Sequence, residues 1–163
     1  MNSNILIEKM IEFNSNDPKR VQHLIKVHSF ANLICEMENV DLHTQFITEC
    51  AALVHDIGIR PAEQKYGNCN GKLQEQEGGI YAHNLLNELN FNQSDIDRIC
   101  YLVSHHHTYD KIDGIDYQIL VEADFLVNFY EDNLDKQTIQ KTVDKIFKTS
   151  YGIKLCNIIY NLD

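Results

Sequence analysis

The sequence predicts an all-α protein, a compact bundle of about six to nine helices. Apolar residues recur at spacings of three and four almost throughout, whereas the alternation typical of strands is hard to find. Only two prolines and seven glycines punctuate 163 residues, which favours long elements. Hydrophobic residues make up 44% and charged residues 23%, as in ordinary globular proteins, and the length suits one hydrophobic core. We therefore expect a single domain over residues 1–163.

The first half of the chain predicts three helices, of which the third is central. A short helix covers about residues 4–13. A long helix covers about 18–38, because Asp17 can accept a hydrogen bond as N-cap and the proline that follows it loses no hydrogen bond at the first helical position. Thr44 can cap the next helix, about 44–58, which is apolar on every side over its last turns. Such a helix is expected in the middle of the domain.

The second half predicts a loop with a functional role and further helices around it. Segment 66–72 is too rich in glycine and asparagine for regular structure and is long enough for a functional loop. Ser94 and Asp97, three residues apart, resemble a capping box. We expect a short helical piece after Pro61, helices over about 79–89, 94–106 and 117–130, and two weaker amphipathic helices within 133–163 with Gly152 between them.

Charge and cysteine content exclude several classes of function. Lys and Arg number 14 against 24 Asp and Glu, a net charge of −10 that would repel duplex nucleic acid. The amino terminus lacks the basic start and apolar run of a targeting segment, and no stretch approaches a membrane span, so we expect a cytoplasmic protein without a membrane partner. Five irregularly spaced cysteines without a Cys-x-x-Cys pair indicate neither a disulfide framework nor a zinc knuckle.

His28 is the histidine of the long helix that we expect to face the core. Val21, Leu24 and Ile25 form one stripe, and continuing it by three to four residues reaches His28. His23 lies off this stripe, and we expect it at the surface.

Polar residues also interrupt two strongly apolar segments. His55 and Asp56 end the all-apolar helix, where an unpaired charge would cost several kcal/mol. A carboxylate must likewise be accommodated within 119–127, and here the periodicity slightly favours Glu122 over Asp124 as the inward one. Burial of any of these groups requires a partner.

A triple histidine follows the apolar stripe of the 94–106 helix. The stripe continues onto His106 and His107 rather than His105. A metal ion would satisfy all of these inward groups together, because neutral imidazole and carboxylate are ligands for iron, manganese, zinc, cobalt or nickel. Each group taken alone also has an ordinary explanation, such as a hydrogen-bonded core histidine or an ion pair with arginine or lysine.

The order of these residues resembles that of the HD-domain metal-dependent phosphohydrolases, in which a histidine is followed by a His-Asp pair, further histidines and a final aspartate. The resemblance covers about residues 20–130, and it favours Asp124 over Glu122. It implies an all-helical bundle around one or two divalent ions and hydrolysis of phosphomonoesters or nucleotides. The matching segments are VHSFANLI with His28, AALVHDIG with His55 and Asp56, LVSHHHTY, and LVEADFLVN with Asp124.

The same resemblance implies further metal ligands, and at one of them this sequence departs from the family pattern. Diiron members often carry another histidine on the helix after the His-Asp pair, and here Glu77 would replace it, with His83 as the rival six residues later. We favour Glu77 because it stands at the expected helix start. Within the triple histidine we expect His106 to bind metal, and His105 and His107 to contact the substrate, with a second-metal role as the alternative for His105.

Hydrolysis of a small phosphate ester by a metal-activated water is the expected function. His28, His55, Asp56 and Asp124 would hold the metal, and Asp56 would also orient the attacking water. The cations expected at the substrate phosphate are Arg60, which we count among the catalytic residues, and Lys65 and Lys72 beside the loop.

Two other functions stay open from the sequence. Glu77 as a ligand would suit a diiron oxygenase on the same scaffold. A helical signalling or assembly module with a structural metal is the non-enzymatic alternative. The apolar faces of the helices after residue 133 would serve a homodimer as well as a core.

Overall fold

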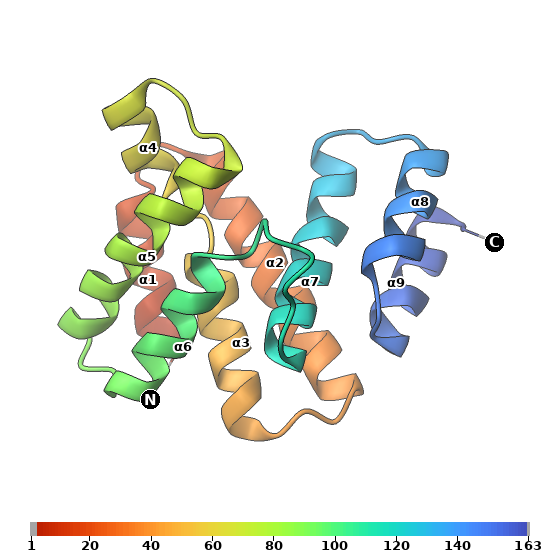
Figure 1. Ribbon diagram of the computed structural model, residues 1–163, viewed down its shortest axis with the longest axis horizontal. Helices are drawn as coiled ribbons and strands as arrows, with labels where there is room; N and C mark the ends of the chain where they lie inside the picture. The colour runs from red at the N-terminus through yellow and green to blue at the C-terminus, as the bar shows by residue number, and fades with distance from the viewer. Residues whose placement is uncertain (1–2, 163) are drawn as a thin grey trace.

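The computed structural model describes residues 3–162, so the ends of the expected domain, 1–2 and 163, lie outside it. Helices lie in three groups side by side: α1, α4, α5 and α6, then α2, α3 and α7, then α8 and α9 (Figure 1). No strand occurs within 3–162, and the all-α prediction is confirmed. The helices are α1 (Ser3–Phe13), α2 (Pro18–Met37), α3 (Leu42–Val54), α4 (Ile59–Tyr66), α5 (Gly71–Glu88), α6 (Gln93–Val103), α7 (Ile115–Glu131), α8 (Lys136–Ile146) and α9 (Ser150–Tyr160).

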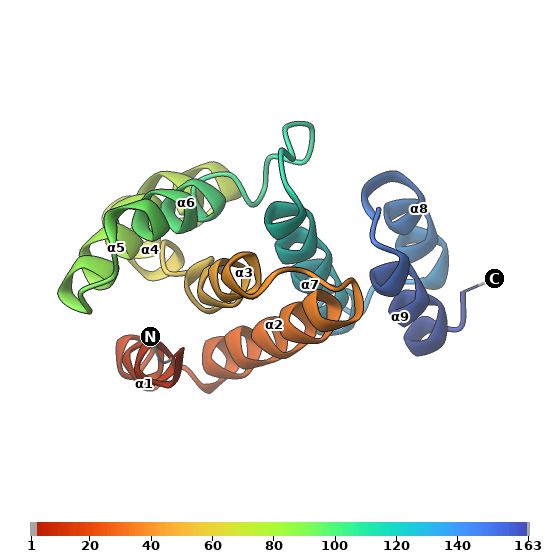
Figure 2. The ribbon, with the colours of Figure 1, turned by 90° about the horizontal axis from the view of Figure 1, so that it is seen from below.

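Helix α3 is the central helix that its all-round apolarity predicts. Every residue from Cys50 to Val54 is buried, and α3 packs against α1, α2, α6 and α7. Figure 2 shows it enclosed between α2 and α6. Because α3 ends at Val54, the His-Asp pair that follows it emerges inside the bundle.

Side-chain caps set the starts of several helices, and the sequence predicted one of those caps. Asp17 accepts from the backbone N of Arg20 at 3.1 Å, as expected. Thr44 and Ser94 are not the caps of their helices: Asp41 caps α3 and Asn92 caps α6, each by accepting backbone N–H bonds.

Helix α5 begins earlier than the sequence predicts, at Gly71 instead of about residue 79. The Asn70 side chain accepts from the backbone N of Leu73 at 3.1 Å, which starts the helix inside the expected loop. Glycines on both sides permit close packing: a Cβ on Gly58, just before α4, would lie 2.6 Å from the backbone N of Gly78 in α5. These small residues therefore bring α5 against its neighbours.

A buried carboxylate attaches the α8–α9 pair to α7. Glu122 accepts from the Gln118 side chain at 2.7 Å, from the backbone N of Lys148 at 2.6 Å and from the backbone N and hydroxyl of Thr149. Gly152 lies in the first turn of α9 and not between two helices, and a Cβ there would stand 2.1 Å from Glu122 Oε2. Glu122 is thus inward, as periodicity favoured, but it faces the carboxy-terminal helices. None of the helices within 3–162 has the length and apolarity needed to cross a bilayer.

Replacing Glu122 by Gln should destabilise the fold. The glutamine NH2 would face donors that now bond to a carboxylate, leaving at least one buried donor without an acceptor, at a cost of about 1–3 kcal/mol. We expect a lower denaturation midpoint in urea for Glu122→Gln and an unchanged one for Glu36→Gln, an exposed site on α2. Equal midpoints for the two variants would contradict this role.

Candidate metal centre

Four side chains from three parts of the chain bring donor atoms together in the bundle interior. His23 lies on α2, His55 and Asp56 follow α3, and Asp124 lies on α7. The two Nε2 atoms of His23 and His55 are 3.3 Å apart, and they lie 3.2 and 3.5 Å from Asp124 Oδ1. Each Nε2 is also 3.5 Å from Asp56 Oδ2. Two imidazoles and two carboxylates therefore surround one point.

Three histidines here, His23, His55 and the neighbouring His106, are each oriented by a polar contact of Nδ1. His55 Nδ1 donates to the carbonyl of Ala52 at 2.9 Å, and His106 Nδ1 donates to the carbonyl of Val103 at 2.8 Å. His23 Nδ1 lies 3.0 Å from Glu131 Oε2. These acceptors fix Nδ1 as the donor, so each Nε2 lone pair points inward as a metal ligand requires.

His106 extends the centre beyond the first four residues. Its side chain is 1% exposed, and its Nε2 is buried without a hydrogen-bond partner, 3.6 Å from Asp56 Oδ1. His107 joins the same group: one donor atom each from Asp56, His106 and His107 lie within 4.8 Å of one another. Asp56 thus stands between two sets of donors.

The donor atoms fit a first-row transition ion. Ligands bound at 2.0–2.2 Å to one ion are separated by about 2.9–3.6 Å at tetrahedral or octahedral angles. The separations of 3.2–3.5 Å around His23 and His55 fall in this range. Two facing Nε2 lone pairs repel each other unless a proton or a cation lies between them. The geometry around His23 and His55 therefore suits one ion, and the unpartnered His106 Nε2 suits a second ion in the donor set of Asp56, His106 and His107.

The two aspartates raise the pKa values of His23 and His55, whereas burial dominates at His107. Burial alone would lower the pKa of His55, but the charge of Asp56 and the hydrogen bond to Asp124 raise it to about 9. For His23 burial again opposes the Asp124 hydrogen bond, and its pKa is raised. Burial and the nearby His106 lower the pKa of His107 to about 4, so this ring stays neutral at pH 7.

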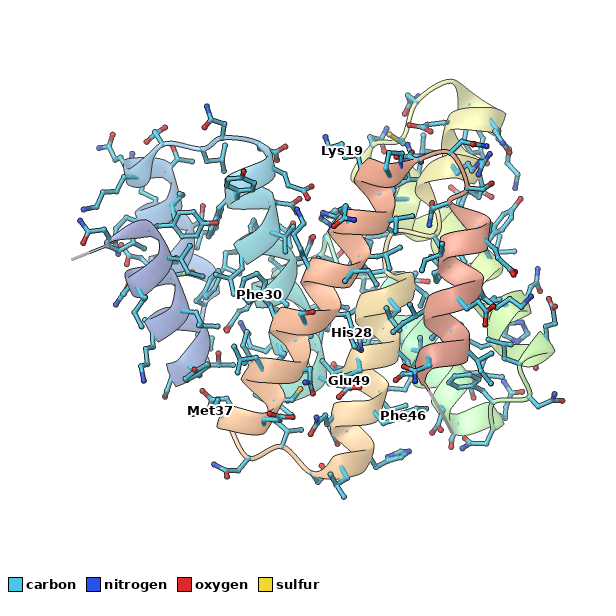
Figure 3. All side chains as sticks on the ribbon, turned by 180° about the vertical axis from the view of Figure 1, so that it is seen from behind. Lys19, His28, Phe30, Met37, Phe46 and Glu49 are labelled. Atoms are coloured by element: carbon cyan, nitrogen blue, oxygen red, sulfur yellow. The ribbon has the colours of Figure 1, made fainter. Side chains whose placement is uncertain are left out.

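The structure places His23, and not the expected His28, among the donor atoms of the centre. His23 is 7% exposed, not at the surface as predicted. His28 lies on another side of α2, against Glu49 of α3, with 3.7 Å between Nε2 and Oε2. Figure 3 labels His28 and Glu49 where α2 passes α3. The buried stripe of α2 runs through Leu24, Val27 and Ala31, and His23 continues it toward the amino end.

Comparison with known proteins identifies the family. The family model described as "HD domain" matches residues 20–146. The chain belongs to the HD domain family. The matched residues include those of the centre, which lie on α2 and α7 and just after α3 and α6.

A solved structure resembles this HD domain over nearly its whole length. It is the crystal structure of a predicted HD superfamily hydrolase from an uncultured Thermotogales bacterium, with a TM-score of 0.65 and 25% sequence identity. The similarity covers 99% of this chain and 92% of that chain. No curated protein matches significantly.

Glu77 is buried, but other side chains occupy its carboxylate. Lys65 forms an ion pair with Oε2, and the Tyr66 hydroxyl donates to Oε1 at 2.9 Å. Because α5 starts at Gly71, Glu77 stands in its second turn and faces α4, not at a helix start. The rival His83 is exposed, with Nδ1 3.1 Å from the Asn87 side-chain nitrogen.

Three further residues that the sequence assigned to the site, Arg60, Lys72 and His105, have other surroundings. Arg60 Nη1 donates to the carbonyl of Phe13 at 2.6 Å, so this guanidinium is bound to the end of α1. Lys72 is exposed on the first turn of α5. The His105 ring stacks on Tyr101 at 4.3 Å beside a surface hollow between α5 and α6.

The two histidines of α2 allow a direct test of the ligand assignment. We expect His23→Ala to lose most bound metal, because one of four inner donors disappears, and His28→Ala to retain it. Metal content per chain after loading with Mn²⁺ and dialysis measures both. Metal loss in His28→Ala with retention in His23→Ala would contradict the assignment.

Metal binding should release protons. At pH 7 the metal-free His55, with a pKa of about 9, is protonated, and the raised pKa of His23 favours its protonation too. A metal needs neutral imidazole, so we expect release of about one or two protons and an affinity that rises from pH 7 to 9. Calorimetric titration in buffers of different ionisation enthalpy measures the release, and an identical heat in all buffers would contradict it.

Proposed function

We propose that this HD domain is a metal-dependent phosphohydrolase that acts on a small phosphate ester or nucleotide. The opening of the centre at Asp56 carries the proposal. The Asp56 side chain is 26% exposed, whereas those of His55 and Asp124 are 0% and 11% exposed. Asp56 and His23 line a hollow of about 280 Å³. A buried donor set with one open side leaves room for water and substrate.

Two cations that suit a phosphate lie in the same hollow, beside four carboxylates. Arg20 and Lys19 line it at the first turn of α2, together with Asp17, Asp56, Glu131 and Asp132. Arg20 is held in place by Glu63, 2.7 Å from its Nη2, and by Asp17, 3.3 Å from its Nη1. In a chain with a net charge of −10 and an acidic lining here, an anion would be bound by local contacts with the guanidinium and the metal ion, not by the overall field. Arg20 therefore replaces Arg60, Lys65 and Lys72 as the preferred phosphate ligand.

The chain's own residues would position the reactants. His23, His55, Asp56 and Asp124 would hold the ion, whose chemistry when bound is to lower the pKa of water and to neutralise phosphoryl charge. Asp56 Oδ1 and His106 Nε2, 3.6 Å apart, would orient the attacking water and accept its proton. The Arg20 guanidinium would bind phosphoryl oxygens. With a second ion, Asp56, His106 and His107 would be its ligands.

The other functions have less support from these contacts. A diiron oxygenase would be favoured if Glu77 were a metal ligand, but Lys65 and Tyr66 already donate hydrogen bonds to that carboxylate. A structural metal would suit a closed coordination sphere, whereas Asp56 faces a hollow. The similar crystal structure is described as a hydrolase.

The test is phosphate release from a broad panel of nucleotides and phosphomonoesters by protein loaded with Mn²⁺ or Fe²⁺. We expect turnover of at least one class and its loss, together with metal loss, in Asp56→Ala. No release from any compound would overturn the proposal, and oxygen consumption without phosphate release would favour the oxygenase.

Two arginine variants in the same assay test the substrate side. Arg20→Ala should lower kcat/KM by about 10- to 100-fold, the loss expected for charged hydrogen bonds worth about 1.5–3 kcal/mol. Arg60→Ala is the matched control and should change kcat/KM little, because its guanidinium binds Phe13. A larger effect at Arg60 than at Arg20 would restore the assignment made from the sequence.

A further inference from the structure

A chain of polar contacts leads from the metal centre to the surface through His23. Its Nε2 lies 3.2 Å from Asp124, and its Nδ1 lies 3.0 Å from Glu131 Oε2. The other oxygen of Glu131 is 2.5 Å from Lys26 Nζ. The Glu131 side chain is 12% exposed and that of Lys26 is 38% exposed. Glu131, at the end of α7, thus connects His23 and Lys26 of α2.

His23 needs such a partner because of its place in α2. His55 and His106 stand just beyond α3 and α6, where the last helical carbonyls lack partners within the helix, and each ring bonds one of them. His23 lies well inside α2, where the backbone carbonyls already bond within the helix. An acceptor for its Nδ1 must therefore come from another element, and Glu131 provides it.

We propose that Glu131 is a positioning residue for His23, and that Lys26 stabilises Glu131 in that role. The inference rests on the proposed metal site. The carboxylate fixes the tautomer and direction of the ring, so that Nε2 faces Asp124 and His55, and it raises the basicity of Nε2 toward a cation. Lys26 acts one step further out, since it contacts Glu131 and not His23.

Metal affinity separates this role from a simple ion pair between α2 and α7. We expect Glu131→Ala to weaken Co²⁺ binding by about 10- to 100-fold, measured by competition with a chromogenic chelator. Glu131→Gln should recover part of the loss, because its amide oxygen still accepts from Nδ1. Lys26→Met, which removes the ion pair but keeps the acceptor, should change affinity by less than about threefold. Equal losses in Lys26→Met and Glu131→Ala would overturn the inference.

A double variant tests whether Glu131 acts through His23. In a His23→Ala background, Glu131→Ala should weaken the residual Co²⁺ binding no further. An additional loss equal to that in the wild-type background would show that Glu131 acts elsewhere and would overturn the inference.

Two spectroscopic readouts are independent of activity. NMR of the zinc-loaded protein should show the His23 Nδ1–H proton shifted downfield by its hydrogen bond to a carboxylate, and this shift should be reduced in Glu131→Ala and kept in Lys26→Met. The visible Co²⁺ spectrum should change in the same variants. If wild-type protein binds no Co²⁺, the metal site itself fails. If it binds and Glu131→Ala matches it in affinity and spectrum, only the role of Glu131 fails.

Discussion

The arrangement of α2, α3, α6 and α7 depends on the accommodation of charge inside an apolar bundle. Asp124, His55 and His106 are nearly inaccessible to water, and an unpaired buried charge is far more costly than a buried hydrogen bond is stabilising. The two aspartates neutralise protonated imidazoles when no metal is bound, but His106 Nε2 still lacks a partner. One divalent cation would satisfy the donor atoms around His23 and His55, and a second would satisfy His106 Nε2. The groups that are costly to bury without a metal ion are thereby placed where they can bind one.

Helix ends and helix interiors contribute differently to this centre. His55 and His106 follow helices whose last carbonyls orient their rings, so each needs only its own helix. His23 and Asp124 lie within helices and depend on other side chains: Glu131 for the first, and Asn128, which donates to Asp124 at 2.9 Å, for the second. Glu122 attaches the α8–α9 pair to the outer side of α7. One helix therefore connects the centre with the carboxy-terminal part of the fold.

Sequence periodicity predicted most of the helices and placed His106 inward, and it failed where two edges of one helix look alike. His23 and His28 lie roughly 140° apart around α2, on opposite borders of its buried stripe. The position of α7 decides which border faces the centre, and one helix alone does not encode that position. The structure places Glu77 and Arg60 elsewhere for another reason. Lys65 pairs with Glu77, and the Phe13 carbonyl accepts a hydrogen bond from Arg60. Such local partners leave no periodic signal in the sequence. His55 and Asp56 were predictable because polar groups interrupt an apolar segment there, whereas Asp124 was predicted from the family resemblance, against a periodicity that favoured Glu122.

Anomalous diffraction from crystals of the metal-loaded protein would locate the ion. With data at the absorption edge of manganese or iron, we expect a peak at coordination distance from His23 Nε2, His55 Nε2, Asp56 and Asp124. A peak beside His28 and Glu49, or a loaded crystal without a peak among these four side chains, would contradict it.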